Sequence, residues 1–343
     1  MSSSAKQIEI GAVARTPRLG FVGLGWIGRN RLASIVEAEM AEIAAVYDAQ
    51  AEAAVEGHKL APDAVLFSSF DDLLNEDLDG VIIATPNRFH ADQAIAALER
   101  GTAVFCQKPL GRNASETESI VHAARNANRL LGVDLTYSAI PAMKTVSGLV
   151  ESGALGKIFA VDAKFHNGYG PDKPWFYDFS LSGGGCVLDL GSHLLDLVLQ
   201  PLRFPRISHV QSSLFVQGKS LKKGEREIED YATATIETAD DTVINLSCCW
   251  KLNVGREANI EIAFYGTRGG AALRNVSGSF YDFVAERFEG TRMETLSKPE
   301  DLNWQWGGLV TIEWIKQLAV DGSFDPSAER FVAIAEIIDE IYQ

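Results

Sequence analysis

The sequence has few of the features that mark a secreted or membrane-bound protein. Its 343 residues include four cysteines without a C-x-x-C pair, so we expect free thiols that pack as small apolar side chains. They are Cys106, Cys186, Cys248 and Cys249. No run of 18 apolar residues occurs, and the first residues lack the apolar core of a signal peptide. These absences predict a cytoplasmic protein without a membrane span.

Basic residues are also scarce. The chain has 31 lysines and arginines against 46 aspartates and glutamates, which gives a net charge of −15. Such a surface repels nucleic-acid phosphates and anionic lipids, so we expect neither as a partner. The composition that is present, 46% hydrophobic and 22% charged, is that of a globular chain long enough for about two domains.

Residues 1–135 alternate short apolar strands with helical segments. We expect the strands at 18–22, 42–47, 65–67, 80–85, 102–106 and 130–135. Strands separated in this way by helices predict right-handed β-α-β units. The first domain is therefore expected to be an α/β, doubly wound parallel sheet of the Rossmann type, with ligands bound at the carboxyl ends of its strands.

Residues 136–343 follow a different pattern. A helix is expected at 143–152 and a strand at 157–165, and from residue 207 onward most segments are strands. Alternation such as Ala-Thr-Ala-Thr at 232–235 indicates strands with one buried face. With two closing helices, this predicts an α+β domain built on an open, mostly antiparallel sheet.

A G-x-G-x-x-G motif follows the first strand and opens a helix. Its positions are Gly23, Leu24, Gly25, Trp26, Ile27 and Gly28. In that context, backbone N–H groups at a helix start can bind a pyrophosphate. Asp48 ends the second strand 20 residues later, where its carboxylate can bind a ribose and repel a 2′-phosphate, which favours NAD over NADP. The alternative for Asp48 is a strand-end cap.

Two more polar turns end strands at the same edge of the sheet. Thr85, Pro86 and Asn87, followed by His90, come after the fourth strand, and Gln107, Lys108 and Pro109 after the fifth. Thr85, Pro86, Asn87, His90, Gln107 and Lys108 are candidate cofactor contacts. Asn87 could equally cap a helix, and Pro109 could carry a cis bond.

In the second domain, Asp189 and His193 are four residues apart and so share one face of a helix. A carboxylate beside a histidine orients the ring and supports a general base. A buried core histidine is the alternative. Asp196 lies three residues further on and could support the histidine or cap the structure. Because no second histidine lies near, we expect no metal site.

Together these residues resemble the glucose–fructose oxidoreductase / inositol dehydrogenase (Gfo/Idh/MocA) family over nearly the whole chain. In that family the fifth strand ends in Glu-Lys-Pro, and a helix carries Asp-x-Gly-x-His-x-x-Asp, which is complete here from Asp189 to Asp196. The resemblance implies a two-domain NAD(P)-dependent enzyme for sugars or cyclitols. It implies Lys108 and His193 as catalytic residues, Asp189 as partner of His193, and a homodimer or homotetramer formed through the open sheet.

Gln107 departs from the family pattern, because a glutamine replaces the glutamate before the lysine. If the two side chains interact, the missing negative charge would let Lys108 lose its proton more readily. Exchanging Gln107 for glutamate should then shift the pH–rate profile.

The predicted reaction is reversible hydride transfer between nicotinamide and a carbinol carbon of a sugar-like polyol. His193 would remove the hydroxyl proton and Lys108 would polarise the same oxygen. Four residues are candidate substrate contacts, with packing as the alternative: His166, Asn167, Trp175 and Tyr177. A glycosidase that uses bound NAD and a non-catalytic NAD-binding regulator are alternatives on the same scaffold.

Overall fold

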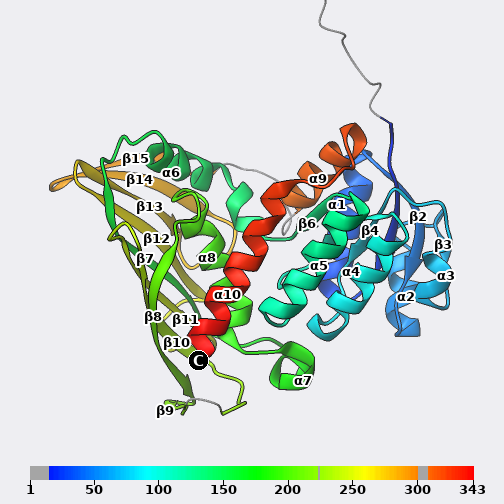
Figure 1. Ribbon diagram of the computed structural model, residues 1–343, viewed down its shortest axis with the longest axis horizontal. Coiled ribbons are helices and arrows are strands. Elements are labelled where there is room, and N and C mark those ends of the chain that lie inside the picture. The colour runs from blue at the N-terminus through cyan, green and yellow to red at the C-terminus, as the bar shows by residue number, and fades with distance from the viewer. Residues whose placement is uncertain (1–14, 223–224, 300–307) are drawn as a thin grey trace, which may run out of the picture.

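A computed structural model describes residues 15–222, 225–299 and 308–343 (Figure 1). The first domain holds a six-stranded parallel sheet in the order β3-β2-β1-β4-β5-β6. Its strands are β1 (Arg18–Val22), β2 (Glu42–Tyr47), β3 (Val65–Leu66), β4 (Gly80–Ile83), β5 (Ala103–Cys106) and β6 (Leu131–Val133). The strand order reverses between β1 and β4, as in other doubly wound folds, and the predicted fold class is confirmed.

Helices cover both faces of this sheet because its strands are apolar on both sides. Phe21 and Phe105 face one core, while their neighbours Val22 and Cys106 face the other. The first face packs against α1, and the second packs against α4 and α5. The helices are α1 (Trp26–Ala38), α2 (Ala51–His58), α3 (Phe70–Leu73), α4 (His90–Glu99) and α5 (Ala114–Ala127), with a 3-10 turn at Asn87–Phe89.

The second domain is built on a nine-stranded sheet in the order β15-β14-β13-β12-β7-β11-β10-β8-β9. Every neighbouring pair is antiparallel except β7 and β11, which confirms the predicted open, mostly antiparallel sheet. The strands are β7 (Ile158–Asn167), β8 (Ile207–Val216), β9 (Lys219–Ser220), β10 (Tyr231–Thr238), β11 (Val243–Cys249), β12 (Ala258–Gly266), β13 (Gly269–Asn275), β14 (Phe283–Glu289) and β15 (Arg292–Ser297).

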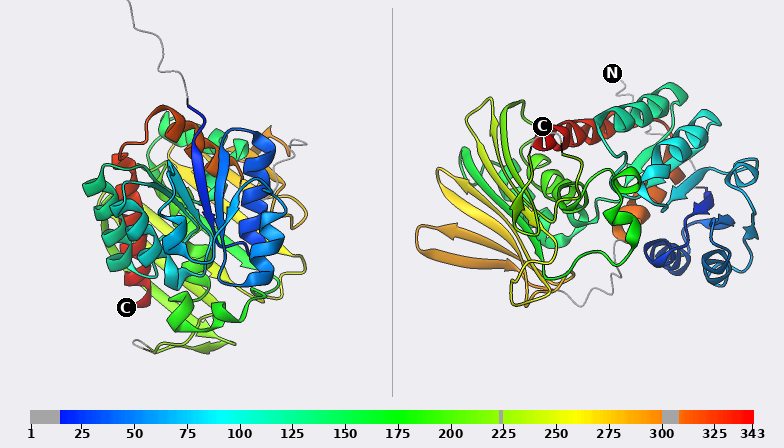
Figure 2. Two further views of the ribbon diagram at one scale, coloured as in Figure 1. Left: turned by 90° about the vertical axis from the view of Figure 1, so that its right-hand side faces the viewer. Right: turned by 90° about the horizontal axis from the view of Figure 1, so that it is seen from below.

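The described helices of the second domain lie on one face of this sheet, as the right-hand view of Figure 2 shows. They are α6 (Pro141–Glu151), α7 (Phe179–Ser182), α8 (Ser192–Leu199) and α10 (Arg330–Tyr342). Short turns join them: 3-10 turns at Thr136–Ala139, Pro174–Tyr177 and Pro326–Glu329, and one π-helical turn at Val187–Gly191. All four cysteines are free and buried, as predicted.

Helix α9 (Gly308–Val320) crosses back to the first domain (Figure 1). Trp314 and Ile315 join the core of the parallel sheet, where Trp314 lies 5.6 Å from the ring of Phe105. A Cβ at Gly80 or Gly132 would lie 2.6 Å from the indole, so both glycines make room for it. The segment that was predicted in the 136–343 domain thus completes the core of the first. Of the helices in the described ranges, none is long and apolar enough to cross a membrane.

Candidate active site

The turn between β1 and α1 contains three glycines, and the surroundings of each differ. Gly23 has a φ of +91°, and a Cβ there would lie 2.5 Å from the Ala84 backbone. A Cβ at Gly28 would lie 1.9 Å from the Gly23 carbonyl oxygen. The close packing of the backbone therefore requires glycine at both positions. Gly25 differs, because no atom other than those of adjoining residues lies within 4 Å of its Cβ position. Since it begins α1 without a side-chain cap, that open space suits a ligand that approaches the helix N-terminus.

Asp48 follows β2 and closes the same turn. One carboxylate oxygen accepts a bond from the Leu24 N–H at 2.5 Å, and the other accepts from the Gln50 N–H at 2.7 Å. The side chain stays half-exposed beside the turn. Trp26 is exposed and Ile27 half-buried in the first turn of α1. The structure thus brings the predicted cofactor residues of the first two strands together at one edge.

The residues after β4 form hydrogen bonds that connect this turn to the turn after β5 and to α7. His90 is fully buried, with one ring nitrogen 2.8 Å from the Pro109 carbonyl and the other 2.7 Å from the Thr85 carbonyl. Burial lowers the pKa of this histidine. Asn87 donates to the Ser182 carbonyl at 2.8 Å and so ties this turn to α7. Both ring nitrogens of His90 thus lie against backbone carbonyls, and Pro86 is half-exposed beside them.

Lys108 lies two residues after β5 and reaches into the second domain. Its Nζ donates to the Asp189 carbonyl at 2.9 Å and to Asp189 Oδ1, and the Lys108–Pro109 bond is cis. Asp189 Oδ2 accepts from the indole N–H of Trp250 at 2.9 Å. The lysine and aspartate side chains are 18% and 16% exposed, so solvent reaches the pair.

This arrangement corrects the predicted partnership of Asp189 with His193. Both oxygens of the carboxylate are engaged by Lys108 and Trp250. An ammonium group stabilises a carboxylate more than a neutral imidazole does. Burial lowers the pKa of His193, so its imidazole is neutral. Asp189 therefore positions the lysine.

His193 is buried under aromatic rings in the first turn of α8. It is 6% exposed, its Nδ1 has no hydrogen-bond partner, and Tyr137 meets it edge-on at 5.0 Å. Burial holds the pKa of His193 well below its usual value, and the positive charges of Lys108 and Arg31 lower it further. The imidazole is therefore neutral at neutral pH, which is the form from which a general base acts.

Gln107 faces away from Lys108, into a buried cluster. Its amide donates to Asp134 Oδ2, which also accepts from Arg31 Nε, and all three side chains are buried. The predicted effect of Gln107 on the deprotonation of Lys108 required the two side chains to interact, but Gln107 bonds to Asp134 and the lysine pairs with Asp189. A glutamate here would place a second carboxylate against Asp134, whereas glutamine donates to it.

Glu229 holds the turn that carries Asp189. Its buried carboxylate accepts from the N–H groups of Gly185 and Val187, at 3.0 and 2.9 Å, and from the Tyr342 hydroxyl at 2.9 Å. Burial raises its pKa to about 7, although those hydrogen bonds oppose the rise. A Cβ at Gly185 would lie 2.0 Å from the Glu229 carbonyl oxygen, so that glycine permits the close approach.

Of the predicted substrate contacts, the structure separates His166 from the others. His166 lies 2.7 Å from the Ser247 hydroxyl. Its neighbour on β7, Phe165, packs against His193 at 6.4 Å, and side chains alternate along a strand, so His166 points to the opposite face of the sheet. Asn167 shares the face of Phe165, and its buried Oδ1 has no partner.

The loop that carries Trp175, Phe176 and Tyr177, here called the aromatic loop, contacts Trp250 of the site. Trp175 stacks on Phe176 at 3.8 Å, and Phe176 and Tyr177 lie edge-on to Trp250 at 6.1 and 5.8 Å.

Asp196 was predicted to support His193 or to cap the structure. Its carboxylate accepts a hydrogen bond from the Gln200 amide, and burial raises the pKa of Asp196 to about 6.

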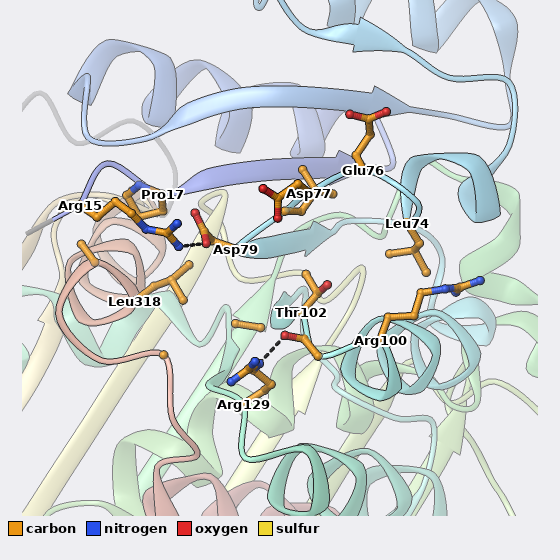
Figure 3. A pocket seen from close by; sticks show the side chains of 15 residues that line it. Arg15, Pro17, Leu74, Glu76, Asp77, Asp79, Arg100, Thr102, Arg129 and Leu318 are labelled. Carbon is orange, nitrogen blue, oxygen red and sulfur yellow. Dashed lines mark hydrogen bonds and ion pairs between the residues drawn. The ribbon is translucent and has the colours of Figure 1, made fainter.

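A hollow of about 440 Å³ lies at the amino ends of β1, β4 and β5, the edge opposite to Lys108 (Figure 3). Its arginines are already engaged: Arg15 pairs with Asp79, and Arg129 donates to the Gly101 carbonyl, as the dashed lines in Figure 3 mark. Arg100 pairs with Asp71. This self-paired surface contrasts with the lysine edge, where His193 keeps an unpartnered nitrogen.

Comparison with known proteins decides the family. Residues 17–135 match the model of the oxidoreductase family with an NAD-binding Rossmann fold, and residues 143–272 match the Gfo/Idh/MocA C-terminal domain. The chain belongs to the Gfo/Idh/MocA family. The two matches cover the parallel sheet, most of the second sheet as far as β13, and the residues Lys108, Asp189 and His193.

Relatives of this Gfo/Idh/MocA protein include sugar dehydrogenases. D-glucoside 3-dehydrogenase of Escherichia coli (strain K12) is 28% identical over 205 residues, 57% of this chain and 58% of that one. Levoglucosan dehydrogenase of Pseudarthrobacter phenanthrenivorans is 27% identical over 213 residues, 56% of this chain and 54% of that one. The match thus spans a little more than half of each relative.

Among solved structures, levoglucosan dehydrogenase in complex with NADH and L-sorbose superimposes with a TM-score of 0.79. It is 22% identical, and the alignment covers 95% of this chain and 96% of that one. At this identity the likeness supports the fold.

Proposed function

We propose that this protein is an NAD-dependent oxidoreductase that transfers hydride between nicotinamide and a carbinol of a sugar or cyclitol. The observation that carries the proposal is the contact between a lysine of the first domain and an aspartate of the second. Lys108, two residues after β5 in the NAD-binding domain, contacts Asp189 in the turn that leads to His193. The names of the relatives, a glucoside dehydrogenase and a levoglucosan dehydrogenase, support the sugar class.

The first domain has the features that NAD requires. The open space at Gly25 accommodates a pyrophosphate near the start of α1, and the half-exposed Asp48 accommodates an adenosine ribose. The carboxylate of Asp48 repels a 2′-phosphate, which supports NAD over NADP. Once bound, NAD accepts or returns the hydride.

His193 and Lys108 act on the substrate oxygen. In oxidation, the neutral imidazole takes the hydroxyl proton as the C–H bond delivers its hydride and the carbonyl forms. Lys108 donates to that same oxygen and stabilises the negative charge that develops on it. Asp189 positions the lysine through its carbonyl and carboxylate, and Trp250 positions Asp189.

Asn167, Trp175 and Tyr177 are the proposed substrate contacts. The unpartnered Oδ1 of Asn167 lies on the His193 side of β7 and can accept from a sugar hydroxyl. The aromatic residues form a wall that ends on Trp250. His166 is left out, because it points to the other face.

The outer face of the nine-stranded sheet supports a homodimer or homotetramer. The described helices of the second domain all lie on its inner face, which leaves the outer face open to a second copy of the chain. Light scattering after gel filtration should give twice or four times the mass of 37.3 kDa. The free thiols suit a cytoplasmic location.

The experiment compares three variants on sugars, glycosides and cyclitols with NAD, and follows NADH absorbance. His193→Ala and Lys108→Ala should each lower kcat by about a hundredfold or more and retain NAD binding. His122→Ala, which changes an exposed histidine of α5, should keep full activity. An undiminished rate in His193→Ala would contradict the mechanism. Cleavage of a glycoside without net NADH would indicate the glycosidase, and NAD binding without any turnover would indicate a regulator.

A further inference from the structure

A cavity of about 330 Å³ lies beside the candidate active site and shares Trp250 with it. We call it the Trp250 cavity. Four separate segments line it: the aromatic loop with α7, the end of β8, the segment before β10, and the residues after β11. The lining residues that matter below are Tyr177, Phe179, Arg226, Asp230, Trp250 and Lys251. Its volume lies in the range of ligand sites, which is about 300–1,000 Å³.

Aromatic rings give this cavity flat apolar surfaces. Tyr177 is 42% exposed and lies 5.8 Å from the Trp250 ring, at 66° to it. Its hydroxyl donates to the Pro171 carbonyl at 3.0 Å, which fixes the ring. Phe179 begins α7 on the same wall. A fixed aromatic face packs well against the C–H face of a sugar ring.

The charged groups around these rings balance one another. Lys251 lies 4.6 Å from the centre of the Tyr177 ring, and Arg226 lies 5.8 Å from that of Phe179. Glu227 and Asp230 also line the cavity, so two cations face two carboxylates. A cavity without net charge gives no advantage to a phosphate or carboxylate, whereas its donors and acceptors suit neutral hydroxyl groups.

Trp250 belongs both to this cavity and to the hydrogen bonds around Lys108. The indole N–H of Trp250 donates to Asp189, and Asp189 holds Lys108. A ligand in the cavity would therefore contact the residue that holds Asp189 in place.

We propose that the Trp250 cavity is a subsite for a second, uncharged sugar ring. The substrate would then be a disaccharide or a larger glycoside, of which one ring is oxidised at Lys108 and His193. This inference rests on the proposed function, since it names the substrate class for that site. A stacking contact of this kind is worth about tenfold in affinity.

The test fills the cavity from outside the catalytic groups. Val216→Trp places a bulky ring on its β8 wall, and Val320→Trp, at a 72% exposed position of α9, is the matched control. With saturating NAD, kcat/KM is measured for methyl glucoside, maltose, cellobiose and trehalose. In the wild type and the control, at least one disaccharide should exceed methyl glucoside about tenfold. Val216→Trp should remove that advantage and leave the rate on methyl glucoside unchanged.

Two results would overturn the subsite: no disaccharide exceeds methyl glucoside, or Val216→Trp lowers the rates on all four sugars in parallel. A binding measurement separates this failure from that of the proposed function. If no sugar is oxidised, the proposed function fails, and calorimetric titration of the NADH-loaded protein with the same sugars decides the subsite. Tighter binding of a disaccharide, lost in Val216→Trp but kept in Val320→Trp, supports the subsite. Equal or absent binding refutes it.

Discussion

The buried carboxyl of Glu229 should make the stability of this protein depend on pH. Its pKa rises from 4.5 to about 7 on folding, chiefly because burial disfavours the charged form. A carboxyl group whose pKa is raised on folding contributes stability that is fully present below the unfolded pKa and is lost as the pH rises through the folded pKa. Each pKa unit is worth about 1.4 kcal/mol, so the full contribution is about 3 kcal/mol.

Glu229→Gln isolates this contribution. The amide oxygen can still accept from the N–H groups of Gly185 and Val187, but it does not titrate. Urea unfolding of both proteins is followed by circular dichroism between pH 5.5 and 8.5. Over this range the wild type should lose about 2 kcal/mol of unfolding free energy relative to the variant, since part of the contribution is already lost at pH 5.5.

Asp196→Asn is the matched control, because Asp196 is also buried and the same physical cause raises its pKa, to about 6. Its difference from the wild type should fall mainly below pH 7, and that of Glu229→Gln should continue to fall above it. A difference between wild type and Glu229→Gln that stays constant from pH 5.5 to 8.5, or that grows with pH, would refute the reasoning.

Three further predictions concern the site. Gly25→Ala should leave the melting temperature unchanged and weaken NAD binding about tenfold or more, as measured by calorimetry. Gly28→Ala should lower the melting temperature, because its Cβ would lie 1.9 Å from a carbonyl oxygen. An equal loss of stability in both variants would contradict this. Gln107→Glu should cost about 1–3 kcal/mol of stability at pH 8 and less at pH 6, measured by thermal unfolding, because it sets a second carboxylate against Asp134. Trp250→Phe should lower kcat/KM about tenfold by removing the N–H donor to Asp189, and an unchanged value would show that this bond does not position the lysine.

The first domain could be predicted from the sequence because its signals are local. Each strand is a short apolar run followed by a helix, and the glycine motif marks the turn at which the first strand meets its helix. The predicted strands at 18–22 and 42–47 match β1 and β2 residue for residue. Strand β15 was not predicted, since most of its residues are exposed and give no alternating pattern.

Contacts between distant segments escaped prediction. Lys108, Asp189 and His193 could be chosen from motifs, but their pairing depends on which charges face one another after folding. Trp250 and Glu229 have no local motif, and only the fold brings them to the turn at 187–191. Neither residue could be singled out from its neighbours in the sequence.

Helix α9 limits how this protein can be divided or recombined. A fragment that stops at residue 135 would leave an open trench over Gly80 and Gly132, where the indole of Trp314 belongs. Such a fragment should aggregate unless the helix at 308–320 is supplied, either in trans or by fusion. A chimera that exchanges the cofactor specificity of two related enzymes must therefore transplant two separate pieces of chain, the first domain and the helix at 308–320.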